Sequence, residues 1–104
     1  MRATREEIIT FLREIKVQLV DAGIAQVALF GSYARDEAGV YSDIDIAIAK
    51  EKDYLQTRTA YDYFQEVAKL KEQLREKFQK NSDIFDLDSD SFMKHSIMRD
   101  LIYV

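Results

Sequence analysis

Residues 27–32 read Val-Ala-Leu-Phe-Gly-Ser, and ten residues later residues 43–49 read Asp-Ile-Asp-Ile-Ala-Ile-Ala. An apolar run that ends at a Gly-Ser pair predicts a strand over 26–30 and a tight turn, followed by a short helix over 32–38. The strict alternation of the second run predicts another strand over 43–49. The two strands frame a turn that offers backbone N–H groups and a hydroxyl.

Alternation places the aspartates and alanines of 43–49 on one face of the strand and the three isoleucines on the other. We expect the isoleucine face to be buried. The face with Asp43 and Asp45 is then open or lines a cleft.

With the flanking segments included, the chain is predicted to alternate four helices and four strands. A helix over 5–21 begins at the capping residue Thr4 and ends in a left-handed turn at Gly23. The remaining expectations are a helix over 54–80 capped by Asp53, a strand over 82–88, a helix over 90–99 and an edge strand over 101–104. This order predicts an α+β fold, a small mixed β-sheet with helices mainly on one face, formed by a single domain over 1–104.

Composition limits the classes of function. The 104 residues are 47 % hydrophobic and 33 % charged, with a net charge of −4 and no cysteine. Disulfides and thiolate metal sites are therefore excluded, and no apolar run approaches the length of a bilayer span. The basic residues at 69–80 alternate with acids, which indicates a solvated helix face rather than a nucleic-acid-binding stripe. We expect a soluble cytoplasmic protein that uses neither membrane nor bulk nucleic acid.

Asp43 and Asp45 are candidate ligands for divalent cations. Two residues apart on a strand, their Cβ atoms lie about 6–7 Å apart on one side, which suits carboxylates that share one or two cations. Like charges about 5 Å apart at an effective dielectric near 20 cost roughly 3 kcal/mol. No lysine or arginine within 43–49 offsets this cost. A bound cation would remove it.

A third carboxylate is expected from the strand over 82–88, and two residues compete for the role. Asp83 begins the strand and is favoured, whereas Asp86 faces the opposite side. Asp83 shares its face with Phe85 and Leu87, which would then lie on the open side of the sheet. There they would cover part of a nucleotide site or meet a partner.

The glycine turn is the candidate phosphate-binding element. Gly31 lets the backbone approach a phosphate closely, and Ser32 adds a hydroxyl at the start of a helix whose N–H groups favour anions. Arg35, one helical turn on, either reaches a phosphate or pairs with Asp36 or Glu37.

At these residues the chain resembles the minimal nucleotidyltransferases of the DNA polymerase β superfamily, above all the MntA-type antitoxins that are paired with HEPN-domain RNase toxins. The resemblance covers nearly the whole length, from the Gly-Ser turn through Asp43-x-Asp45 and the strand at 83–87 to the closing Ile102-Tyr103-Val104. It implies a polymerase-β-like nucleotidyltransferase fold.

The resemblance also implies a function. AMP would be transferred from ATP to a tyrosine hydroxyl of the HEPN toxin, with which the chain would form a hetero-oligomer. Two Mg²⁺ ions would be bound by Asp43, Asp45 and Asp83, the catalytic residues. Gly31 and Ser32 would hold the triphosphate together with Asp43 and Asp45.

Two alternatives remain open. The chain could be a non-catalytic antitoxin, a binding module with a vestigial site, because it is small and has no acceptor-binding domain of its own. It could instead modify a small molecule such as an aminoglycoside.

Three further features have competing interpretations. The sheet face with Phe85 and Leu87 could dock a partner. The aromatic cluster of Tyr54, Tyr61 and Tyr63 could also do so, although helix packing explains these rings at least as well. The lone His95 is expected to be structural, at the surface or half-buried.

Overall fold

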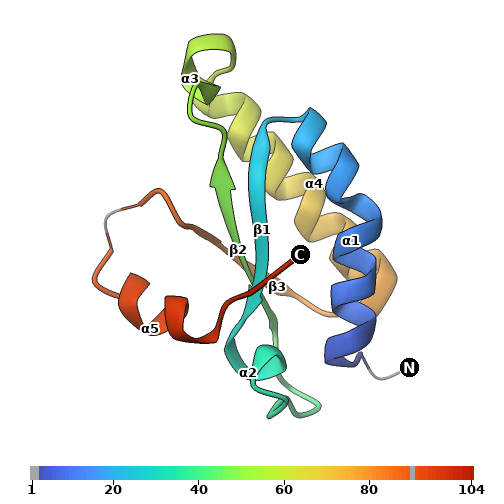
Figure 1. The fold of residues 1–104 in the computed structure, drawn as a ribbon. Coiled ribbons are helices and arrows are strands. Elements are labelled where there is room, and N and C mark those ends of the chain that lie inside the picture. The colour runs from blue at the N-terminus through green and yellow to red at the C-terminus, as the bar shows by residue number, and fades with distance from the viewer. Residues whose placement is uncertain (1–2, 90) are drawn as a thin grey trace.

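The computed structural model describes residues 3–89 and 91–104 and confirms the mixed α+β fold (Figure 1). A four-stranded sheet has the order β3-β2-β1-β4, in which β2 and β3 are parallel and the other two pairs are antiparallel. In these two ranges no helix is both long and apolar enough to cross a bilayer. The elements in chain order are α1 (Arg5–Asp21), β1 (Ile24–Phe30), α2 (Gly31–Ala34), β2 (Ile44–Lys50), α3 (Tyr54–Thr57), α4 (Ala60–Phe78), β3 (Ser82–Asp86), α5 (Lys94–Asp100) and β4 (Ile102–Tyr103).

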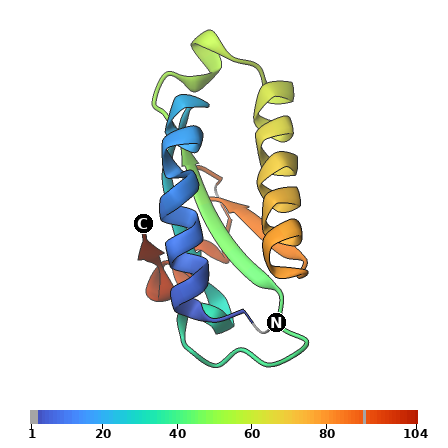
Figure 2. The same ribbon diagram turned by 90° about the vertical axis from the view of Figure 1, so that its right-hand side faces the viewer.

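The two long helices, α1 and α4, cover one face of the sheet side by side (Figure 2). They meet through the edge-to-face rings of Phe11 and Phe78, whose centroids lie 5.6 Å apart. The isoleucines of β2 point into this layer, as expected, and are almost fully buried. The main core combines them with apolar residues of both helices and β1, among them Ile8, Leu12, Leu29, Leu70 and Leu74.

The opposite face of the sheet is covered along most of β2, which corrects the expectation for the aspartate and alanine side. Ala28, Ala47 and Ala49 are buried in a second small cluster with Leu87. Phe30, Phe85 and Leu101 pack around this cluster. The alanines permit close coverage because their side chains are short. Only the end of β2 that carries the aspartates remains accessible.

The helix expected over 54–80 is in fact two helices. Arg58 is extended, at φ −134° and ψ 168°, and separates α3 from α4. Thr59 forms a full capping box with Asp62, whereas the side chain of Asp53 makes no capping hydrogen bond. The capping box satisfies two backbone donors at once, so a new helix begins at Ala60. Phe64, although apolar, is 66 % exposed on α4.

Other boundaries shift by a few residues. The first strand begins two residues early, at Ile24, and β2 runs one residue later than expected. The helix expected over 32–38 is a single turn, because Asp36 adopts a left-handed φ of 61°. At the C-terminal side, β3 ends at Asp86, α5 covers only 94–100 and β4 only 102–103, while residue 90 lies outside the described residues. The 5–21 helix and the left-handed turn at Gly23 are confirmed.

Candidate active site

The turn after β1 lies directly against Asp45 of β2. Phe30 pairs with Asp45 in the antiparallel ladder, and Gly31 follows with a φ of +75°. A Cβ atom at position 31 would lie 2.2 Å from the Oδ2 atom of Asp45 and 2.9 Å from its Cγ. Both the backbone conformation and the contact therefore require glycine. Ser32 comes next, half-buried in the first turn of α2.

Three carboxylates, those of Asp43, Asp45 and Asp83, lie at this end of the sheet, near enough for the charges of Asp43 and Asp83 to act on Asp45. The parallel β2–β3 register places Asp83 beside Asp45, on strands that lie about 4.8 Å apart. Burial, together with the charges of Asp83 and Asp43, raises the pKa of Asp45, against a smaller lowering effect of Arg35. Asp43 and Asp83 are themselves exposed. The half-buried Asp45 thus lies at the centre of an acidic group that solvent can reach.

Asp86 belongs to a different environment. It pairs with Ile48 in the ladder, so it faces the helix layer, and its carboxylate lies 2.8 Å from Lys50 Nζ. Burial alone would raise the pKa of Asp86, but the bonds from Lys50 and from the Asp88 backbone N–H outweigh it and lower that pKa. The Lys50 ammonium also lies 4.3 Å from the centre of the Tyr63 ring. Asp86 is engaged in this network, on the far side of the sheet from Asp45.

Arg35 lies at the end of α2, where its backbone N–H donates to the carbonyl of Gly31 at 3.1 Å. Its guanidinium pairs with Glu37 at 3.3 Å, one of the two local partners that the sequence allows. The shorter contact, 2.7 Å, is to Asp100 at the end of α5. Sequence reasoning missed Asp100, because no local pattern links two residues 65 positions apart.

The segment that leads into Asp43 is held by a residue that sequence reasoning also missed. Lys80 Nζ donates to the carbonyl oxygens of Val40 and Ser42, at 2.7 and 3.2 Å. The hydroxyl of Ser42 in turn accepts the backbone N–H of Gly39 at 2.9 Å. A lysine between α4 and β3 therefore fixes the approach to the acidic group. In sequence, Lys80 was indistinguishable from the other charges at 69–80.

The donor set fits a magnesium ion that binds together with a phosphate. In the described part of the chain, no three histidine, cysteine or acidic side chains converge into an all-protein metal site. Mg²⁺ is usually held by one or two carboxylates, with waters and phosphate oxygens completing its shell. Asp45, with Asp43 or Asp83, supplies such carboxylates next to the Gly31 turn. No histidine is needed, and His95 is exposed on α5.

The two surfaces that the sequence left open as places for a partner to dock are largely packed within the fold. Leu87 is buried and Phe85 half-buried, so neither forms an open apolar sheet face. Of the aromatic cluster, Tyr54, the first residue of α3, is buried, and Tyr63 packs against it, with ring centroids 6.1 Å apart. Tyr61 alone of the three is largely exposed. Helix packing therefore explains the first two tyrosines.

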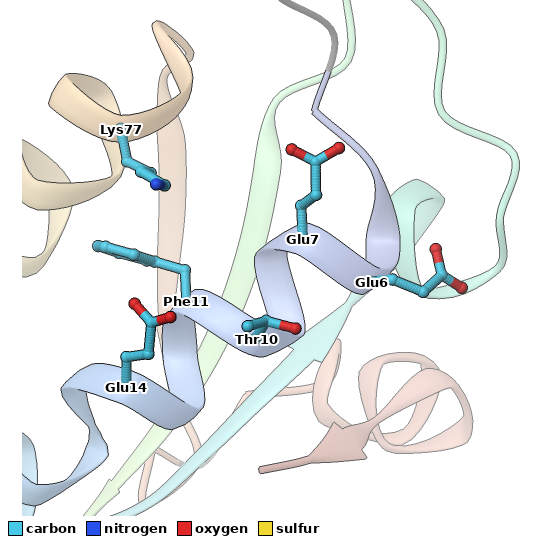
Figure 3. A pocket seen from close by; sticks show the side chains of 6 residues that line it. All are labelled: Glu6, Glu7, Thr10, Phe11, Glu14 and Lys77. Carbon is cyan, nitrogen blue, oxygen red and sulfur yellow. The ribbon is translucent and has the colours of Figure 1, made fainter.

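A separate groove of about 260 Å³ lies between α1 and α4 (Figure 3). Phe11 and Lys77 face one another across it, with glutamates of α1 around them. The groove belongs to the helix layer, on the opposite side of the sheet from Asp45. Its acidic lining would repel a nucleotide. The lining residues are Glu6, Glu7, Thr10, Phe11, Glu14 and Lys77.

Known proteins resemble this chain over nearly its whole length. Three proteins of Methanocaldococcus jannaschii, each named "Putative protein adenylyltransferase", are 36, 33 and 35 % identical to the chain. Each match covers 97 % of this chain and 98 % of the relative. The similarity therefore extends over whole proteins of the same size.

Two solved structures share the fold. One, described as "Structure of putative minimal nucleotidyltransferase", has a TM-score of 0.71 at 26 % identity and covers 96 % of this chain and 95 % of that one. A toxin–antitoxin structure with AMP-PNP has a TM-score of 0.59 at 24 % identity, over 97 % of this chain and 72 % of that one. Residues 6–104 match the family described as "Polymerase beta, Nucleotidyltransferase". The chain is a nucleotidyltransferase and belongs to this polymerase β family.

Proposed function

We propose that the chain transfers the adenylyl group of ATP to a tyrosine hydroxyl of a HEPN-type toxin and so silences it. The observation that carries the proposal is the contact between the Gly31 turn and Asp45, with Asp83 beside it on β3. This arrangement joins a backbone that can approach phosphate to carboxylates that can hold its cation. The catalytic group is Asp43, Asp45 and Asp83.

Each residue of the site has a distinct task in this reaction. The turn at Gly31 and the Ser32 hydroxyl hold the triphosphate, and Arg35 adds positive charge one helical turn away. Asp43, Asp45 and Asp83 would hold two Mg²⁺ ions, whose charge would offset that of the phosphates. The tyrosine oxygen attacks that phosphorus, pyrophosphate leaves and the phenolic proton is lost to solvent.

The acceptor is proposed from the relatives rather than from a pocket. The M. jannaschii proteins are named for adenylylation of proteins, and they match the chain over nearly its full length. The structural neighbour with AMP-PNP is a toxin–antitoxin, although its likeness to this chain establishes the fold alone. The HEPN partner, the tyrosine and the hetero-oligomer rest on the sequence resemblance.

The test is to incubate the full chain with a HEPN-type toxin, ATP and Mg²⁺, and to measure the intact mass of the toxin. We expect added adenylyl groups, which peptide mapping places on tyrosine. Asp43→Asn should abolish the addition. Asp53→Asn is the matched control, because Asp53 is an exposed aspartate whose side chain makes no capping bond.

Other outcomes would reject the proposal. If the wild type and Asp43→Asn neutralise the toxin equally, with no change in mass, the chain is a binding module with a vestigial site. If the chain modifies free small molecules but not the toxin, the acceptor is wrong.

A further inference from the structure

The contact between Arg35 and Asp100 joins the C-terminal part of the chain to the candidate active site. Asp100 is the last residue of α5, and the chain continues at once into β4, where Ile102 pairs with Leu29 of β1. Ile97, one turn earlier in α5, is buried. Asp100 is thus held from both sides by packed structure. Its side chain is 25 % exposed, against 66 % for Glu37, the other partner of Arg35.

The two carboxylates hold Arg35 by two of its three nitrogens. Nε donates to Glu37 and Nη1 donates to Asp100. Within the described residues, no hydrogen bond to a protein acceptor is found for Nη2. A guanidinium is a planar fork of five donors, so fixing one edge also fixes the direction of the remaining N–H groups.

A backbone hydrogen bond links Arg35, and so its guanidinium, to the candidate phosphate-binding turn. Its N–H donates to the Gly31 carbonyl, and Gly31 in turn contacts the Asp45 carboxylate. A positive charge held here, at the edge of three carboxylates, is well placed to accompany an anionic nucleotide tail. The side chain is otherwise 44 % exposed and would be free to leave the site.

We propose that Asp100 is a positioning residue, which orients Arg35 so that its free N–H groups face the phosphate tail of a nucleotide bound between Gly31 and Asp45. The inference rests on the proposed function, since it needs a nucleoside triphosphate in that site. Asp100 itself touches neither nucleotide nor metal and acts only through Arg35.

Long-range electrostatics and the positioning role of Asp100 predict opposite effects on ATP binding when Asp100 is replaced. Asp100 is an anion near an anion-binding site, so removing its charge should strengthen ATP binding if only long-range electrostatics mattered. If Asp100 positions Arg35, its loss should weaken ATP binding. The sign of the change therefore separates the two explanations.

The experiment measures binding of Mg²⁺·ATP, ADP and AMP to the full chain by calorimetry, and KM and kcat for adenylylation of the toxin. For Asp100→Asn we expect ATP affinity to fall and KM for ATP to rise about three- to tenfold, with kcat nearly unchanged and AMP affinity unaffected. Asp100→Glu should restore part of the loss. Asp36→Asn is the matched control, because it removes a neighbouring exposed charge that is not among the ion-pair partners of the Arg35 guanidinium, and asparagine accepts its left-handed φ.

A double-mutant cycle keeps the test independent of any effect on folding. Arg35→Ala should weaken ATP binding, and adding Asp100→Asn to it should cause no further loss. Unchanged or tighter ATP binding by Asp100→Asn, or an equal further loss in the Arg35→Ala background, would overturn the inference. A wild-type chain that binds no Mg²⁺·ATP would instead defeat the proposed function itself.

Discussion

Asp45 is in an unfavourable position for an ionised aspartate. It is half-buried beside Asp83 and Asp43, and among the described residues no hydrogen-bond donor reaches its carboxylate. Aspartate also has poor strand propensity. Natural sequences retain such local conflicts mainly where function requires them, and a cation bound to ATP would resolve this one.

We predict that Asp45→Asn stabilises the metal-free fold by about 1–3 kcal/mol at neutral pH, because it relieves like-charge repulsion. The folded-state pKa of Asp45 is raised, so its penalty is complete above that pKa. As the pH falls through it, the folded state takes up a proton before the unfolded state does, and the advantage of asparagine disappears. Urea denaturation of both proteins across acid and neutral pH measures this difference. A less stable Asp45→Asn protein at neutral pH would contradict the repulsion between Asp45 and its acidic neighbours.

Gly31→Ala should destabilise the fold by about 2 kcal/mol or more, since alanine is strained at φ +75° and its Cβ would collide with Asp45. Nucleotide binding should fall as well, because the carboxylate must move. Gly39→Ala is the matched control, as a Cβ there meets nothing within 4 Å. Its free energy of unfolding, from the same urea titration, should stay within about 0.5 kcal/mol of wild type. Equal effects of the two substitutions would contradict the contact.

Mutation should distinguish the two candidates for the third carboxylate, Asp83 and Asp86, by their effects on stability and on Mg²⁺·ATP binding. Asp86→Asn breaks the pair with Lys50 and should cost about 1–2 kcal/mol of stability, while Mg²⁺·ATP still binds. The pKa of Asp86 is lowered, so its contribution is present above its ordinary pKa and is lost as the pH falls through the lowered value. Asp83→Asn should do the reverse, leaving or raising stability and weakening Mg²⁺·ATP binding. Calorimetry measures the binding of Mg²⁺·ATP to both variants, and urea denaturation measures their stability. If Asp86→Asn weakened binding and Asp83→Asn lowered stability, the two residues would have the opposite roles.

Among the elements, the break between α3 and α4 gives a direct test of helix capping. Thr59→Ala should cost about 1 kcal/mol, because the Thr59 hydroxyl accepts the backbone N–H of Asp62. Asp53→Ala should change stability by less than about 0.5 kcal/mol, since its side chain caps nothing. Thermal unfolding followed by circular dichroism compares the two. A larger loss of stability for Asp53→Ala than for Thr59→Ala would instead indicate a single helix capped by Asp53, as expected from the sequence.

Elements with local signals could be predicted from sequence, and elements set by distant contacts could not. Thr4 and Gly23 bound α1 correctly, and alternation in β2 correctly assigned its buried face. The Thr59-x-x-Asp62 capping signal was present in the sequence but was overlooked within a long apolar periodicity. Alternation also put Phe85 on the aspartate side, yet it could not show that the chain covers the alanine end of that face.

The same division holds for the candidate site. The spacing of Gly31, Asp43 and Asp45 in the sequence was enough to predict that they lie near one another, because β1 and β2 are consecutive strands. Strand parity also separated Asp83 from Asp86. The hydrogen bond from Lys80 to the Val40 carbonyl and the ion pair between Arg35 and Asp100 depend on how α4 and α5 pack near the site, which no local sequence pattern encodes.

At the scale of the whole molecule, the main apolar core and the candidate site lie on opposite faces of the sheet. The long helices and most of the buried apolar residues lie on one face (Figure 2), while the carboxylates lie at an open end of the other. The site is assembled from β1, α2, β2 and β3, and α5 reaches it through Asp100. A ligand that binds there contacts segments from much of the chain, so its binding energy should oppose unfolding of the whole.

Mg²⁺·ATP should therefore stabilise the folded chain as a unit. A ligand present at about 100 times its Kd adds about 2.7 kcal/mol to the free energy of unfolding, which for a domain of this size raises Tm by roughly 10–20 °C. Scanning calorimetry should show this shift with ATP and Mg²⁺ together, and a much smaller one with ATP and EDTA, because the carboxylates repel an uncompensated triphosphate. Asp53→Asn should keep the shift and Asp43→Asn should lose most of it. A shift that survives EDTA and Asp43→Asn would mean that the nucleotide binds elsewhere, away from the acidic end of the sheet.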